Sequence, residues 1–124
     1  MKMIVGGAYQ GQLEWAKEEN PNVKWIDGET CMPEEIYTCE GIHNFHTLIK
    51  RMLKMEKELG SFAQKLIKEN PNLIIVSDEI GYGLVPIEKF DRMYREQVGR
   101  ICTELASFSE TVVRVVMGRG IRIK

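Results

Sequence analysis

Short apolar runs that fit β-strands alternate with helix-like segments along this 124-residue chain. The strand patterns fall at residues 2–5, 23–27, 73–77 and 111–117, with a last short one at 121–123. Strands that alternate with helices favour a parallel sheet covered by helices on both faces. We therefore predict a three-layer α/β fold with a mainly parallel sheet of four to five strands.

Three helices between these strands are predicted from apolar spacing. The longest follows Pro86, and its apolar stripe recurs at gaps of three and four, at Ile87, Phe90, Tyr94, Val98, Ile101, Leu105 and Phe108. A second helix is predicted from near Ile42, with a buried face of Phe45, Leu48, Ile49, Met52 and Leu53. Ser61 is a candidate N-cap for a short helix through Ile67.

Residues 19–27 and 69–77 repeat one local design, in which a helix end and an Asn-Pro-Asn turn precede a strand. Proline cannot continue a helix and asparagine tolerates turn geometry, so shared turn chemistry explains the repeat. No composition shift marks a linker, and we predict a single domain over residues 1–124.

Composition narrows the class of protein. A net charge of -1 gives no electrostatic reason to expect a nucleic-acid or membrane partner, and no apolar run approaches the roughly 18 residues of a membrane span. The first residues begin a strand pattern rather than a signal peptide. Cys31, Cys39 and Cys102 contain no C-x-x-C pair, so we expect reduced thiols, no zinc site and a cytoplasmic location.

A glycine-rich loop, Gly6-Gly7-Ala8-Tyr9-Gln10-Gly11, joins the first strand pattern to a helix pattern. The frame is that of the P-loop, G-x-x-x-x-G-K-[ST], whose backbone N–H groups and helix N-terminus hold phosphates. Gln12 and Leu13 stand where that pattern has Lys and Ser or Thr. Residues 6–13 are therefore a candidate phosphate site, and a glycine-rich turn that binds nothing remains the alternative.

The two replacements predict weakened chemistry. The P-loop Lys contacts the β- and γ-phosphates, and the Ser or Thr hydroxyl ligates Mg²⁺. Loss of one preorganised transition-state contact costs roughly 3–4 kcal/mol. Gln12 donates only a neutral hydrogen bond and Leu13 cannot ligate a metal. We expect phosphate binding to survive and fast phosphoryl transfer to be lost, and the sequence identifies no catalytic residue.

Acidic residues follow two of the strand patterns. Asp27 ends residues 23–27, the position at which a Walker B aspartate holds Mg²⁺, and it is the candidate metal ligand. Ser77, Asp78 and Glu79 end another strand ahead of Gly81 and Gly83, and Glu79 is a candidate nucleotide contact. An ordinary strand-to-loop aspartate and a capped polar loop are the respective alternatives.

Two histidines and a basic C-terminal segment are weaker candidates. His43 and His46, three apart on the predicted helix, would share a face, but no further ligand stands at a diagnostic spacing, so we interpret them as surface residues. The basic residues Arg114, Arg119, Arg122 and Lys124 are interpreted as a solvated edge that could add charge to a phosphate site.

The C-terminal half matches a [ST]-N-E-V-G-x-G-[IV]-V-P loop and an R-x-[FY]-R-[DE]-x-x-G-R helix at Glu79, Gly81, Gly83, Val85, Pro86, Arg92, Tyr94, Arg95, Glu96, Gly99 and Arg100. With these two motifs it resembles the bifunctional adenosylcobinamide kinase / adenosylcobinamide-phosphate guanylyltransferase family. The family P-loop, G-G-A-R-S-G-K-S, is similar to residues 6–13. The resemblance implies a P-loop NTPase-like fold that binds GTP or ATP with Mg²⁺, a corrinoid partner, a homo-oligomer and a place in cobalamin assembly.

The chain also departs from that family. Gln12 and Leu13 replace Lys and Ser, and Asp78 replaces the family Asn. The family segment that carries the GMP-accepting histidine has no counterpart before residues 23–27, and we do not transfer that role to His43 or His46. The sequence thus predicts a nucleotide-binding relative with reduced or lost kinase and guanylyltransferase activity. A non-catalytic pseudoenzyme that acts as a binding or oligomer-forming partner is the alternative.

Overall fold

The computed structural model describes residues 1–80 and 88–124, and six strands in the described part form one sheet. Their order across the sheet is β2-β3-β4-β1-β5-β6. The strands are β1 (Lys2–Gly6), β2 (Trp25–Asp27), β3 (Gly41–His43), β4 (Ile74–Asp78), β5 (Thr111–Val116) and β6 (Arg119–Arg122). All pairs are parallel except β5 with β6. The central β1 therefore lies between β4 and β5.

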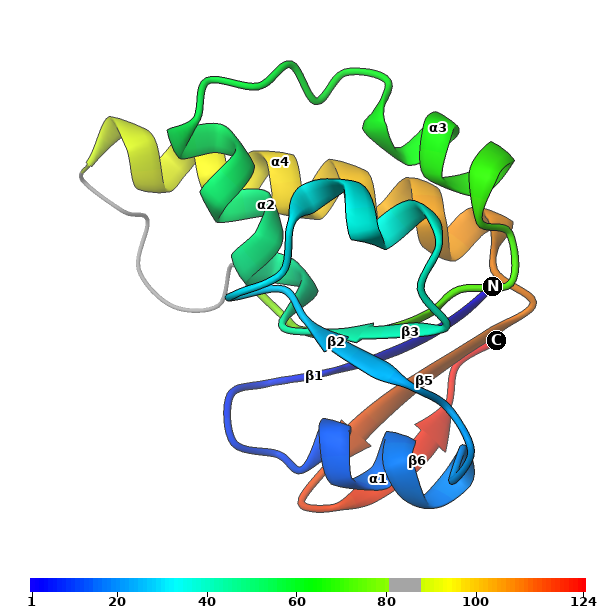
Figure 1. The fold of residues 1–124 in the computed structure, drawn as a ribbon. Helices are drawn as coiled ribbons and strands as arrows, with labels where there is room; N and C mark the ends of the chain where they lie inside the picture. Colours follow the sequence, from blue (N-terminus) through cyan, green and yellow to red (C-terminus); the bar gives the residue numbers. More distant parts are fainter. Residues whose placement is uncertain (81–87) are drawn as a thin grey trace.

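Helices cover both faces of this sheet (Figure 1). On one face lies α1 (Gln12–Glu19), and on the other lie α2 (Phe45–Lys54), α3 (Phe62–Glu69) and α4 (Lys89–Phe108). A short 3₁₀ helix, η1 (Pro33–Tyr37), packs beside α3. The three-layer α/β fold predicted from the sequence is confirmed.

The sheet separates two apolar cores, and β1 contributes side chains to both. Met3 belongs to the larger core under α2, α3 and α4, whereas Ile4 belongs to the smaller core under α1. Successive residues of a strand point to opposite faces, so a strand covered on both faces must be apolar throughout. This requirement explains the uninterrupted apolar run that β1 shows in the sequence.

The predicted helix start near Ile42 is wrong. Ile42 belongs to β3, and α2 begins only at Phe45, after Asn44 adopts a left-handed backbone with φ 53°. Because Ile42 stands three residues before Phe45, it fits the helical spacing although it lies in a strand. This extra strand gives the sheet six strands instead of four to five.

The other helix predictions hold in part. The short helix α3 follows Ser61 as predicted, but the Ser61 side chain makes no capping hydrogen bond, and the helix ends at Glu69 instead of Ile67. Leu53, predicted on the buried face of α2, is only partly buried. The predicted apolar face of α2 is buried at Phe45, Leu48, Ile49 and Met52, and that of α4 at Tyr94, Val98, Ile101 and Leu105. Phe108, at the end of α4, is exposed instead. The predicted helix start at Pro86 and the glycines at 81 and 83 lie outside the described residues.

Asn20 and Asn70 end α1 and α3 with nearly identical backbone angles. In each turn, the asparagine N–H donates four residues back and its carbonyl accepts three residues ahead, which confirms the repeated turn. In the described ranges, no helix combines the length and apolar character that crossing a membrane requires.

Candidate phosphate-binding site

The glycine loop leaves β1 at the carboxyl edge of the sheet and enters α1, as the sequence predicts. Gly11 precedes the first helical residue with φ 87°, a left-handed conformation that side chains rarely adopt. Gly6 has a different reason to be glycine, because a Cβ atom there would lie 2.7 Å from the Val115 carbonyl oxygen. Tyr9 is also left-handed, and its side chain is fully exposed.

Gln12 fills the interior of the loop. Its side chain is buried, with 6% of the residue exposed, and its Nε2 faces three acceptors. Those acceptors are the carbonyls of Gly6 at 3.2 Å and Gly7 at 3.0 Å, and the Asp78 Oδ1 at 2.7 Å. Gln12 thus ties the start of the loop, at Gly6 and Gly7, to the neighbouring strand β4.

The outer side of the loop is held by the β5–β6 hairpin. The Gly118 N–H donates to the Gln10 carbonyl at 2.8 Å, and the Met117 N–H donates to the Gln10 Oε1 at 2.8 Å. Met117 and Gly118 both have positive φ, which is the geometry of a tight two-residue hairpin turn. This contact was not predicted from the sequence, although Gly118 between two strand patterns is a hairpin signal.

The backbone amides of Gly7, Ala8, Tyr9, Gly11 and Gln12 donate to no acceptor in the part of the chain that the structure describes. They stand at the N-terminus of α1, where the helix dipole adds a positive partial charge. Free N–H groups at such a terminus suit an anion such as a phosphate.

Asp78, predicted at the same strand end as Glu79, and His46, interpreted from the sequence as a surface residue, lie directly beside the loop. Asp78 pairs in register with Gly6, and its Oδ2 is 3.5 Å from the His46 Nε2. The Asp78 N–H donates to the His46 Nδ1 at 3.1 Å, and the Tyr94 hydroxyl donates to the His46 carbonyl at 3.0 Å. Burial lowers the pKa of His46 despite the opposing charge of Asp78, and Lys50 lowers it further.

The interpretation of both histidines as surface residues on one helix face is therefore wrong. His43 ends β3, whereas His46 lies in the first turn of α2 with only 12% of its side chain exposed. Asn44 separates them with its left-handed backbone. The helical spacing of three carried no information here, because the helix begins after His43.

Glu79 lies at the same edge, and Arg114 is its ion-pair partner. The Glu79 N–H donates to the Gly6 carbonyl at 2.7 Å, and its carboxylate accepts from the Arg114 Nε at 2.9 Å and Nη2 at 3.2 Å. Asp78 and Glu79 also line one end of a mostly apolar hollow of about 350 Å³ between the sheet and α4.

Asp27, the candidate Mg²⁺ ligand, lies on the outermost parallel strand. Three steps across the sheet separate β2 from β1, which is roughly 14 Å at the usual strand spacing. Its Oδ1 accepts from the Asn44 Nδ2 at 2.9 Å and the Glu29 N–H at 2.8 Å. Burial acts to raise the pKa of Asp27, but these hydrogen bonds and the nearby His43 and Arg51 lower it overall. The metal role of Asp27 stays a prediction.

No group of three or more His, Cys, Asp or Glu side chains in the described residues could hold a metal ion. Cys31, Cys39 and Cys102 form no disulfide. Burial raises the pKa of Cys39 to about 11 and that of Cys102 to about 12, so both thiols stay protonated at neutral pH.

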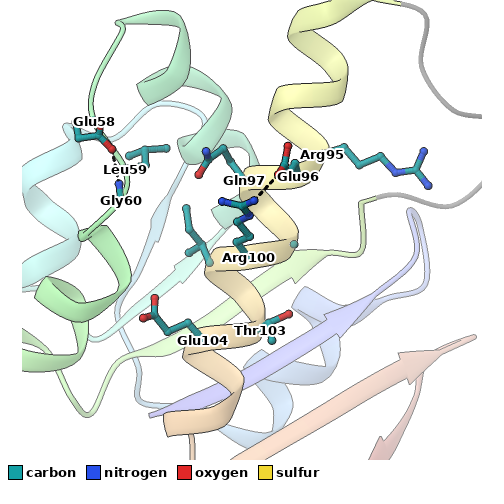
Figure 2. A pocket seen from close by; sticks show the side chains of 11 residues that line it. Glu58, Leu59, Gly60, Arg95, Glu96, Gln97, Arg100, Thr103 and Glu104 are labelled. Atoms are coloured by element: carbon teal, nitrogen blue, oxygen red, sulfur yellow. Dashed lines mark hydrogen bonds and ion pairs between the residues drawn. The ribbon is translucent and has the colours of Figure 1, made fainter.

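A larger groove, of about 760 Å³, lies away from the glycine loop, between residues 58–60 and the outer side of α4 (Figure 2). The Arg100 guanidinium is 2.6 Å from the Glu96 carboxylate, and the Glu58 Oε1 accepts from the Gly60 N–H at 2.7 Å. The groove also holds Glu104, and Figure 2 shows Arg95 extending away from residues 58–60. This mixture of charges favours an anion less than the loop does.

Comparison with known proteins identifies the relatives of the chain. Residues 16–123 match the family model of CobU, described as cobinamide kinase / cobinamide phosphate guanyltransferase. That match leaves out residues 1–15 and with them the glycine loop. The chain is similar to two proteins named bifunctional adenosylcobalamin biosynthesis protein CobU.

The match to the Escherichia coli protein is 32% identical over 74 residues, covering 56% of this chain and 41% of that protein. The match to the Salmonella typhimurium protein is 36% identical over 52 residues, covering 42% of this chain and 29% of that protein. The chain thus spans less than half the length of either curated relative.

Proposed function

Because the chain belongs to the cobinamide kinase / cobinamide phosphate guanyltransferase family, we propose that it binds GTP or ATP, with Mg²⁺, through phosphates held on the glycine loop. The proposal places the protein in cobalamin assembly, with kinase and guanylyltransferase chemistry reduced or lost. The observation that carries it is the loop itself, in which the amides of Gly7, Ala8, Tyr9, Gly11 and Gln12 have no acceptor in the described part of the chain.

Gln12 explains how the loop keeps its shape without a lysine. A P-loop lysine is a donor with a positive charge, and Gln12 supplies the donor through its three contacts but lacks the charge. Leu13 packs against the small apolar core under α1 and has no atom that could ligate a metal. Binding is therefore retained better than catalysis in this proposal.

One observation favours the non-catalytic alternative. The two hydrogens of the Gln12 amide already serve three acceptors, so the loop is stabilised without a ligand. A loop of this kind could serve only as a turn, with the protein acting as a binding or oligomer-forming partner. The corrinoid partner, the homo-oligomer and Asp27 as an Mg²⁺ ligand through water remain part of the proposal.

Calorimetric titration with GTP and ATP, each with and without Mg²⁺, tests the proposal. The wild-type chain is compared with the double variant Gln12→Lys/Leu13→Ser, which restores the P-loop pattern. Glu110→Gln is a control for net charge, because Glu110 is exposed and precedes β5 at the opposite edge of the sheet. We expect wild-type binding near the micromolar range and tighter binding by the double variant.

If neither the wild-type chain nor the double variant binds a nucleotide while both are folded, the nucleotide proposal is wrong and the turn alternative stands. Asp27→Asn is measured alongside. A loss of Mg²⁺-dependent affinity would support Asp27 as a metal ligand, and unchanged dependence would leave it as a residue that holds the turn at residues 27–31.

A further inference from the structure

Gln12 and Asp78 lie 66 positions apart and are in contact at the loop. Both positions depart from the pattern that the chain resembles. The Gln12 Nε2 donates to the Asp78 Oδ1 at 2.7 Å, and register places Asp78 beside Gly6, the first loop residue. The rear of the loop therefore holds a neutral amide and a carboxylate instead of a lysine.

Within residues 1–80 and 88–124, His46 is the side chain paired with Asp78 that can become a cation. Glu79 is paired with Arg114, so these two charges cancel. His46 is the remaining titratable partner, and burial, together with Lys50, lowers its pKa against the effect of Asp78. Its Nδ1 also accepts the Asp78 N–H, which requires the unprotonated nitrogen. At neutral pH the pair of His46 and Asp78 therefore carries one negative charge.

A negative charge at this place opposes a polyphosphate. The Asp78 side chain is 33% exposed, so water screens its repulsion of a phosphate on the loop only in part. Repulsion grows with the charge of the ligand, so a free triphosphate is penalised more than a monophosphate. Magnesium lowers the net charge of a triphosphate and therefore relieves part of the penalty.

We infer that Asp78, held against Gln12, is a specificity-determining residue for the loop. It makes the loop prefer phosphate ligands of low net charge over free nucleoside triphosphates. Such ligands are nucleoside monophosphates and magnesium-bound nucleotides. This inference rests on the proposed function, because it presumes that the loop binds phosphate. It assigns Asp78 an electrostatic effect on the bound phosphates and gives it no step in a reaction.

The test measures the affinities of GMP, GDP and GTP in EDTA, and of GTP with Mg²⁺, for the wild-type chain and for Asp78→Asn. Asparagine keeps an oxygen that accepts the Gln12 amide, so the loop contact is retained. Glu110→Gln makes the same change in net charge at the far edge of the sheet and is the matched control. Gln12→Lys is a second variant: it changes the charge beside the loop by the same amount as Asp78→Asn, but by adding a cation instead of removing an anion.

For the wild type we expect free GTP to bind no more than about threefold tighter than GMP, and Mg²⁺ to improve GTP binding. In Asp78→Asn, free GTP should bind on the order of tenfold tighter than in the wild type and GMP only about threefold tighter. Gln12→Lys should shift the affinities in the same direction. Glu110→Gln should leave all of them within about twofold of the wild type.

Measurable binding that Asp78→Asn and Gln12→Lys leave unchanged would overturn the inference and leave the proposed function standing. An equal gain in Glu110→Gln would overturn it too, because the effect would then come from net charge. If no variant bound any of these ligands, both the inference and the proposed function would fall.

Discussion

Replacing Gln12 by methionine tests whether this side chain holds the loop. Methionine has a similar volume but donates no hydrogen bond, so the apolar packing is kept and the three contacts are lost. The Gly6 carbonyl still accepts the Glu79 N–H at 2.7 Å and stays satisfied. The Gly7 carbonyl and the Asp78 Oδ1 lose the Gln12 donor.

The expected loss of stability follows from these two acceptors. A neutral hydrogen bond contributes about 1 kcal/mol, and one to a charged group about 1.5–3 kcal/mol. The Asp78 side chain is 33% exposed, so water can replace part of its lost bond and the lower end applies. Gln12→Met should therefore lower the free energy of unfolding by about 2 kcal/mol.

Urea unfolding followed by circular dichroism measures this difference. Gln12→Lys is the matched variant, because a lysine donates to the same acceptors and adds a charge opposite Asp78. We expect it to be at least as stable as the wild type. If Gln12→Met were as stable as the wild type, with an unchanged urea dependence, the Gln12 hydrogen bonds between the loop and β4 would not stabilise the fold.

Three further predictions concern other parts of the chain. Asn44→Ala should lower the free energy of unfolding by about 2 kcal/mol, because alanine disfavours the left-handed backbone and loses the hydrogen bond to Asp27. Asn44→Gly loses only the hydrogen bond and should cost about 1 kcal/mol. Equal losses for the two variants in a denaturation series would contradict a backbone contribution. Gly99→Ala should raise stability by about 0.5–1 kcal/mol, because a Cβ there meets nothing within 4 Å inside a helix; thermal melts that show a loss would disprove it. Because the pKa of His46 is lowered in the folded protein, its contribution to stability should be fully present above pH 6.5 and should be lost as pH drops through the folded-state pKa. His46→Gln should weaken this pH dependence, and the control His43→Gln should retain it. Unfolding measured between pH 5 and 8 tests both expectations.

The sequence predicted the elements whose signal is local. β1 and β4 are apolar runs buried on both faces, and β5 is a valine-rich run interrupted by the exposed Arg114. α4 carries a long periodic stripe, so each of these elements is recognisable within its own residues. β3 is three residues with one large apolar side chain, and it is a strand because β2 and β4 pair with it. Such a strand depends on its neighbours and leaves little trace in its own composition.

The candidate site was predictable to a similar extent. The glycine loop follows from the spacing of Gly6, Gly7 and Gly11 between a strand and a helix. The contact of Gln12 with Asp78 depends on the pairing of β1 with β4 and on its register, neither of which can be read from the residues themselves. The burial of His46 likewise depends on where α2 begins.

The pairing of β1 has a consequence for the order of folding. Lys2 pairs with Ile74 on one side and with Thr111 on the other, so β1 has no partner among the residues that follow it closely. Contacts between distant residues slow folding, because a long loop must close before they form. During synthesis the glycine loop emerges before β4 and the β5–β6 hairpin, and it therefore acquires its shape only when they arrive. Until then the apolar strand next to it is exposed, and a chaperone that shields this segment would improve the yield of folded protein.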